Sequence, residues 1–194
     1  MSGLDETIFQ TETLLHLTVG TMALLDQRER DLARDILMDC KENIIQPLLL
    51  DKTLEFSIEG LEIMNDDPSE VDVVYGRIHC EPLQSMAEYI VNQFTDTGFM
   101  PRQFDRIKLH VTLMNTKFRR TDAEEESSEK SKETMDVREV LELFGDYDFG
   151  EVTVKEIHLS QRRAGKRSKE NYYYPSTIAK LDLYEEFKNV DNDN

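Results

Sequence analysis

The sequence contains little cysteine and no long apolar segment. Its two cysteines, Cys40 and Cys80, lack the paired spacing of a disulfide framework or a zinc site. No run of about 18 apolar residues is present, and the N-terminus lacks the basic and apolar regions of a signal peptide. We therefore expect a protein of the nucleus and cytoplasm, with no metal site, no cofactor and no membrane partner.

Positive charge is also scarce. The 194-residue chain has 23 Lys and Arg against 40 Asp and Glu, which gives a formal net charge of -17 at pH 7. Such a charge repels nucleic acid in bulk, so a local basic patch would have to hold any polyanionic ligand. The length suits one domain built from two similar lobes. We expect this domain over residues 1–183, followed by an acidic tail over 184–194.

The order of patterned segments predicts an α+β fold with two similar halves. In the first half, a strand over 14–19 precedes a helix over about 24–44 that Pro47 ends. In the second half, a helix over 83–94, closed by Gly98, precedes a strand over 107–113. Further strands are predicted at 54–63, 71–79, 152–159 and 177–183, a short helix at 137–144, and a charged, solvated loop at 122–136.

Two predicted strands carry the same motif, Leu-His-apolar-Thr-apolar. It occurs at His16 with Thr18 and again at His110 with Thr112. Residues i and i+2 of a strand share a face, so each histidine and its threonine point the same way, while Leu15, Leu17 and Val19 face the core. One neutral imidazole can accept a proton from an attacking hydroxyl while an imidazolium protonates the leaving oxygen. A threonine hydroxyl can donate to a phosphate oxygen, so the pair predicts metal-free phosphodiester chemistry.

Other interpretations compete with this one. Histidines in apolar strands are often packed or hydrogen-bonded core residues, which would make the chain an α+β interaction module whose histidine substitutions reduce stability. A third copy of the motif, His158 with Ser160, is followed by polar residues, so we expect it to line the edge of the cleft. Besides the phosphoesterase and the interaction module, the remaining alternative is a nucleotide- or RNA-binding subunit with little turnover.

Three further residues are candidates for substrate binding. Arg162 begins a basic run over 162–169, and Tyr173 lies in the tyrosine run that follows, so cations can grip phosphates while a ring stacks on a base. Lys117 lies beyond the second motif and can extend this patch. The alternative for the basic run is a solvated loop that balances acidic neighbours.

The sequence resembles the two-histidine phosphoesterase superfamily through HLTVG at 16–20 and HVTLM at 110–114. The segments LEIMNDDPSEVDVVYGRIH at 61–79, KLHVTLMNTKFRR at 108–120 and IHLSQR at 157–162 resemble the branch found in the activating signal cointegrator complex and in certain A-kinase anchoring proteins. The resemblance covers most of the chain. It implies two lobes of antiparallel sheet and helices around a cleft where both motifs meet. It also implies RNA or nucleotide phosphate ligands, other subunits of the cointegrator complex as partners, and links to transcriptional coactivation and alkylation-damage repair.

One departure from that family concerns the N-terminus. The family has a strand and a helix before the first motif, whereas fifteen residues precede His16 here. The chain is therefore expected to be truncated relative to the family. A missing first strand would expose a sheet edge, through which we expect a dimer or a rearranged N-terminal lobe.

Overall fold

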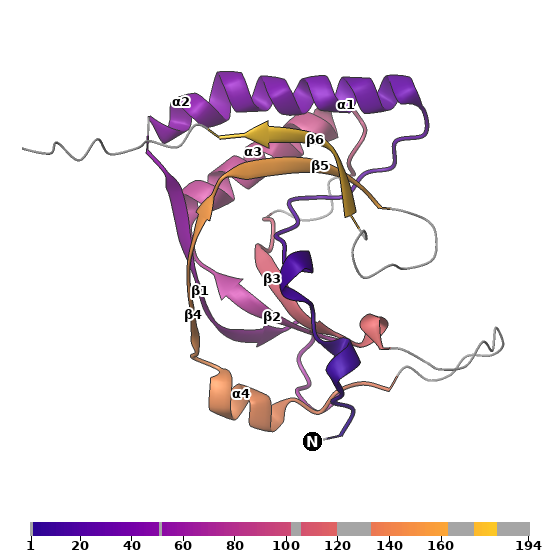
Figure 1. Ribbon diagram of the computed structural model, residues 1–194, viewed down its shortest axis with the longest axis vertical. Coiled ribbons are helices and arrows are strands. Elements are labelled where there is room, and N and C mark those ends of the chain that lie inside the picture. The colour runs from indigo at the N-terminus through magenta and orange to yellow at the C-terminus, as the bar shows by residue number, and fades with distance from the viewer. Residues whose placement is uncertain (1, 51, 102–105, 120–132, 163–172, 182–194) are drawn as a thin grey trace, which may run out of the picture.

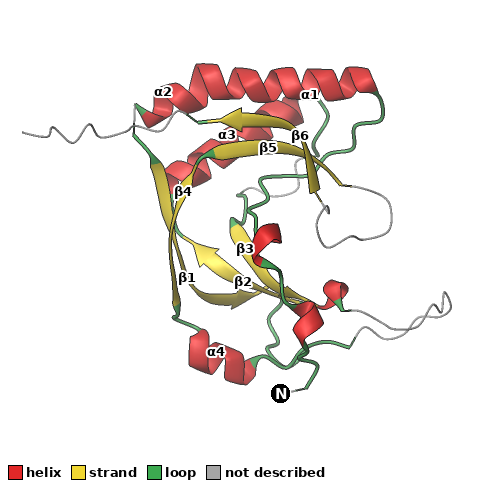
Figure 2. Ribbon diagram, in the orientation of Figure 1, coloured by secondary structure: helices red, strands yellow, loops and turns green. Residues whose placement is uncertain are grey.

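Two antiparallel sheets and the helices packed on them form an α+β fold, as predicted (Figures 1 and 2). The computed structural model describes residues 2–50, 52–101, 106–119, 133–162 and 173–181. The larger sheet has the strand order β3-β2-β1-β4 and contains β1 (Leu54–Ile63), β2 (Val73–Ile78), β3 (His110–Asn115) and β4 (Asp148–Val154). The smaller sheet pairs β5 (Glu156–Arg162) with β6 (Tyr173–Lys180).

The first long helix continues further than the sequence predicts. Asp26 caps α1 (Gln27–Cys40) by accepting from the Glu29 N–H at 2.8 Å. A π-helical segment, η3 (Lys41–Ile45), and α2 (Gln46–Leu49) then extend the helical backbone. The prediction that Pro47 ends the helix is therefore wrong, because Pro47 lies in the first turn of α2, where a missing N–H is tolerated.

The helices of the second half follow the predicted pattern. In α3 (Glu81–Asp96), Leu83, Met86, Ile90 and Phe94 are buried on one stripe, and Gly98 follows with φ of 78°. The short helix α4 (Arg138–Phe144) also forms as predicted. None of the helices among the residues the structure describes is long and apolar enough to cross a membrane.

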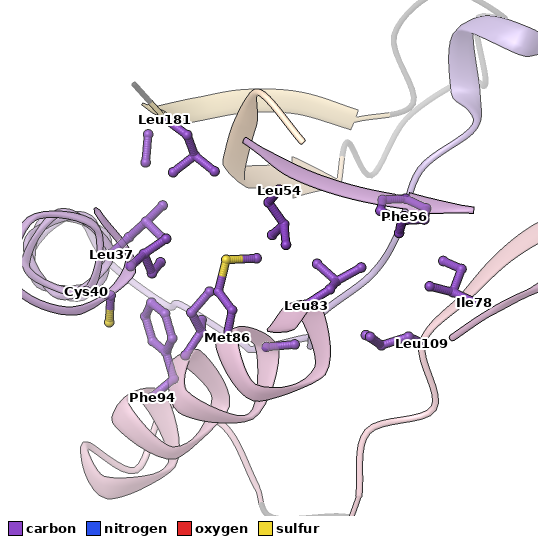
Figure 3. Packing of buried hydrophobic residues seen from close by; sticks show 14 of the residues in the cluster. Leu37, Cys40, Leu54, Phe56, Ile78, Leu83, Met86, Phe94, Leu109 and Leu181 are labelled. Atoms are coloured by element: carbon purple, nitrogen blue, oxygen red, sulfur yellow. The ribbon is translucent and has the colours of Figure 1, made fainter. Parts of the chain in front are cut away.

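The main core lies where α1 and α3 pack together with β1 and the smaller sheet. Figure 3 shows Leu37 and Cys40 of α1 close to Met86 and Phe94 of α3. Leu109, directly before the second motif, is 6% exposed and belongs to this cluster, so the backbone entering β3 is anchored in the core. A second cluster, closer to α4, contains Ile8, Val71, Val74, Met135 and Val137.

The segment that carries the first motif is not a regular strand. A 3₁₀ turn, η2 (Glu12–Leu14), occupies the start of the predicted strand, with the Leu14 N–H bonded to the Thr11 carbonyl at 2.9 Å. The polar residues of this turn favour such local bonds over a strand ladder. The segment meets β3 at two isolated bridges, Phe9 with Met114 and Leu17 with Val111. Between them it uses 17 − 9 = 8 positions against 114 − 111 = 3 on β3, so the turn bulges out.

Two C-terminal predictions also need correction. The single strand predicted over 152–159 is divided at Lys155 between β4 and β5, which belong to different sheets. The last strand, β6, begins four positions before residue 177, where the sequence predicts it. Of the predicted charged loop, residues 122–132 lie outside the described residues, as does the tail 184–194, whereas Met135 is fully buried and bridges Val71.

Candidate active site

The two His-x-Thr motifs lie side by side. Leu17 and Val111 form an antiparallel bridge, and Figure 1 shows the N-terminal segment running along β3. Antiparallel pairing at this bridge sets His16 opposite Thr112 and Thr18 opposite His110. The motifs are 94 positions apart in the chain and directly paired in the fold.

All four motif side chains share one face of this pair of segments. Val111 is in the core and Leu17 packs against it, so the neighbouring positions on each segment point to the opposite face. His16 is exposed there, and Thr18, His110 and Thr112 are half-buried. Leu15 is 43% exposed, so the expectation that it faces the core is wrong.

Both histidines are oriented by the same contact. Nδ1 of His16 donates to the carbonyl of Leu14 at 2.7 Å, and Nδ1 of His110 donates to the carbonyl of Lys108, also at 2.7 Å. A carbonyl oxygen only accepts, so each neutral ring carries its proton on Nδ1. In both rings Nε2 is therefore the nitrogen that accepts a proton as a base or releases one as an acid.

Tyr75 extends this face into the sheet, and the sequence analysis gave it no role. It pairs with Thr112 on one side and with Glu62 on the other. The ring is 1% exposed and packs edge-on to the His110 ring, with centroids 5.3 Å apart and planes at 66°. Its hydroxyl donates to the Glu62 carboxylate. Burial raises the pKa of Tyr75, and the hydrogen bond and charge of Glu62 raise it further, so the phenol stays protonated.

Arg77 also lies on this face, directly opposite His110. Its Nε donates to the Glu59 carbonyl at 3.1 Å, and its Nη2 lies 3.4 Å from the Gly145 carbonyl. Gly60 makes room for this guanidinium, because a Cβ there would lie 2.1 Å from Nη2. Arg77 thus ties β2 to β1 and to the end of α4. The alternation of Tyr75 and Arg77 about Gly76 is the sequence signal from which this face could have been found, and the sequence-based predictions did not use it.

The third motif lies in a different setting. His158 and Ser160 are on β5, in the two-stranded sheet, whereas His110 is on β3 of the larger sheet. His158 uses Nε2 to contact the Glu156 carboxylate at 2.7 Å, unlike the Nδ1 contacts of His16 and His110. His158 therefore differs from the motif pair in its sheet and in the ring nitrogen that it uses.

The remaining substrate-binding candidates are only partly described. Lys117 lies in η4 (Thr116–Phe118), after β3, whereas His110 opens that strand. Five residues of strand separate the two ends of β3 by about 17 Å, so Lys117 is not next to His110. Arg162 and Tyr173 face each other as backbone partners of β5 and β6, and their side chains lie outside the described residues. The rest of the basic run, from 163 onward, also lies outside them.

Metal-ligand geometry is a separate question. Within the described ranges, no group of three or more His, Cys, Asp and Glu side chains is arranged to hold a metal ion.

A match to a family model identifies the family of this chain. Residues 1–181 match the model described as the AKAP7 2'5' RNA ligase-like domain. The chain belongs to this family. Its membership confirms the resemblance to the two-histidine phosphoesterase superfamily that the motifs indicate.

A curated relative agrees with this assignment. The chain is 34% identical over 174 residues to activating signal cointegrator 1 complex subunit 1 of Mus musculus. The match covers 82% of this chain and 49% of the mouse protein. The chain thus spans about half the length of that relative.

Solved structures resemble the fold at low sequence identity. A crystal structure of a phosphoesterase matches with a TM-score of 0.51 and 15% identity, covering 87% of this chain and 77% of the other. The crystal structure of TT0787 from Thermus thermophilus matches with a TM-score of 0.49 and 15% identity, covering 88% and 80% of the two chains. The former likeness supports the phosphoesterase fold of the family member described here.

Proposed function

We propose that this domain is a metal-independent phosphoesterase that acts on RNA ends, cyclic phosphates or short oligonucleotides. His16 and His110 serve as acid and base through Nε2, and Thr18 and Thr112 hold the phosphate. Either histidine can take either role. The observation that carries the proposal is the single antiparallel bridge that sets each histidine opposite the threonine of the other motif.

The chemistry follows from this arrangement. The neutral imidazole accepts the proton of the attacking hydroxyl, and the imidazolium protonates the leaving oxygen. The pair gains one proton and loses one, so its total charge is unchanged by the reaction. The hydroxyls of Thr18 and Thr112 donate to non-bridging oxygens, where negative charge grows in the transition state. The carbonyls of Leu14 and Lys108 keep the proton of each neutral ring on Nδ1. Nε2 is then the nitrogen that accepts or releases the transferred proton.

The experiment is cleavage of a short labelled RNA panel, including cyclic-phosphate ends, in the presence of EDTA. We expect wild type to turn over, and His16→Ala and His110→Ala each to lose turnover while remaining folded. His79→Ala is the matched control, because His79 is exposed and follows β2 outside either motif. Turnover that survives both motif substitutions would exclude the two-histidine mechanism.

A second function is favoured by the name of the mouse relative, which is a subunit of a complex. In this proposal the domain is a catalytically weak nucleotide- or RNA-binding scaffold in an activating signal cointegrator complex, which the family resemblance links to transcriptional coactivation and alkylation-damage repair. Both functions require phosphate binding, so turnover separates them. Saturable binding with no cleavage of any RNA in the panel would favour the scaffold.

Three organisational proposals accompany these functions. Residues 1–183 form a single two-lobed domain, with 184–194 as an acidic tail. The protein works in the nucleus and cytoplasm. A dimer forms through a sheet edge of the N-terminal part, which sedimentation at increasing protein concentration tests directly.

A further inference from the structure

Lys108 stands beside the motif pair, and no role has been given to its side chain. It precedes His110 by two positions, and its carbonyl orients that histidine. Its ammonium lies 4.8 Å from the centroid of the Tyr75 ring and 3.9 Å from Oε2 of Glu62. The side chain is 57% exposed, so the charge is held at the surface of the site.

The contacts that hold Lys108 leave it able to bind an anion. An exposed ion pair at this distance and a cation–π contact are each weak in water. The ring and carboxylate beneath it are far better fixed, since Tyr75 is buried and hydrogen-bonded to Glu62. Tyr75 and Glu62 therefore hold an ammonium above the ring that packs on His110, while more than half of the lysine side chain still faces solvent.

Two arginines near this strand are committed elsewhere. Arg77 faces His110, but its guanidinium donates to the backbone of Glu59 and approaches Gly145 and Asp146. Arg119 is 18% exposed and binds Asp5 and the backbone of Gly3 and Glu133. Of Lys108, Arg77 and Arg119, Lys108 is the one whose side chain is more than half exposed.

We propose that Lys108 binds the phosphate of the ligand, next to Nε2 of His110. This assignment rests on the proposed function of the same site and adds a substrate-binding residue to it. A lysine suits this task because its compact ammonium can follow a phosphate whose charge shifts during the reaction. It also gives an acidic protein one cation, above the ring that packs on His110, with which to hold an anion.

The test measures binding of inorganic phosphate and of adenosine 3'-monophosphate by NMR titration of the folded chain. We expect Lys108→Met to weaken both affinities about tenfold, the effect of losing one charge-assisted hydrogen bond. Lys108→Arg should retain most of the affinity. Lys155→Met is the matched control, because Lys155 is an exposed lysine between β4 and β5.

The outcomes separate the two proposals. Equal binding by wild type and Lys108→Met overturns the inference and leaves the proposed function in place. A loss in Lys117→Met without a loss in Lys108→Met also overturns it, and moves the phosphate to the far end of β3. Wild type that binds neither probe counts against the proposed function itself. A loss confined to Lys108→Met, with Lys155→Met unchanged, supports both.

Discussion

Leu17 pairs with Val111 across an antiparallel bridge, and this pairing aligns the two motifs. The side chains of Leu17 and Val111 point toward the core, and the burial of these two apolar side chains holds the polar face in register. A slip of one residue would turn one histidine toward the core. The apolar positions between His and Thr therefore align the site, although they take no part in its chemistry.

Thr112 provides a direct test of the phosphate-holding role. Thr112→Val keeps the shape of the side chain and removes its hydroxyl, so we expect turnover to fall about 10²-fold with little change in folding. Thr112→Ser keeps the hydroxyl and should retain most activity. Steady-state cleavage rates of both variants, with thermal unfolding as a check, make the measurement. Equal rates in Thr112→Val and wild type would contradict the role.

Tyr75 should make stability depend on alkaline pH. Its pKa is raised above the ordinary value of 10.0 by burial first and Glu62 second, so the folded state holds this proton more tightly than the unfolded state. The contribution is fully present below pH 10.0 and is lost as pH rises through the raised pKa. Tyr75→Phe lacks this proton. We expect the wild-type urea midpoint to fall relative to that of Tyr75→Phe as the pH rises from 10.0 to about 11. Parallel midpoints across this range would show that the phenol titrates normally.

Gly60 should resist substitution because of Arg77. It has φ of 75°, and an added Cβ would meet the Arg77 guanidinium at 2.1 Å and the Gly145 carbonyl at 2.4 Å. We expect Gly60→Ala to lower the free energy of unfolding by about 1–3 kcal/mol. Gly150→Ala is the control, because Gly150 also has positive φ and an added Cβ there meets nothing within 4 Å. Chemical denaturation of both variants measures the destabilisation that the clash causes. Equal losses of unfolding free energy in the two variants would argue against the clash.

Arg119 should stabilise the N-terminal segment that leads to His16. Its Nε bonds Asp5 at 3.0 Å and its Nη2 bonds the Gly3 carbonyl at 2.6 Å. We expect Arg119→Met to cost about 1–3 kcal/mol of unfolding free energy, since partly buried carbonyls lose a charged donor. Arg34→Met serves as the comparison, because Arg34 is 49% exposed and pairs only with neighbouring aspartates on α1. Faster amide exchange near Gly3 in Arg119→Met alone would locate the effect. Equal denaturation midpoints for the two variants would refute it.

The patterns that depend on short stretches of chain were predicted correctly. The α3 stripe from Leu83 to Phe94 forms as expected, because helical spacing alone decides which side chains share a face. Some failures occur where distant contacts override local preference, whereas the turn at 12–14 is formed by local hydrogen bonds. Lys155 is the clearest case. The apolar alternation is uniform through this residue, although the chain passes there from one sheet to the other. The helix that continues through Pro47 is another, since η3 and α2 extend it.

Local periodicity and residue identity were enough to predict the α+β class, the duplicated His-x-Thr motif and the family. The tertiary structure was needed to see that Leu17 pairs with Val111, and that Tyr75 packs on His110 with Glu62 and Lys108 beside its ring. Those residues come from separate strands, and their meeting depends on strand order and register. Register is set by the burial of apolar side chains across the whole sheet, a property that no single segment carries.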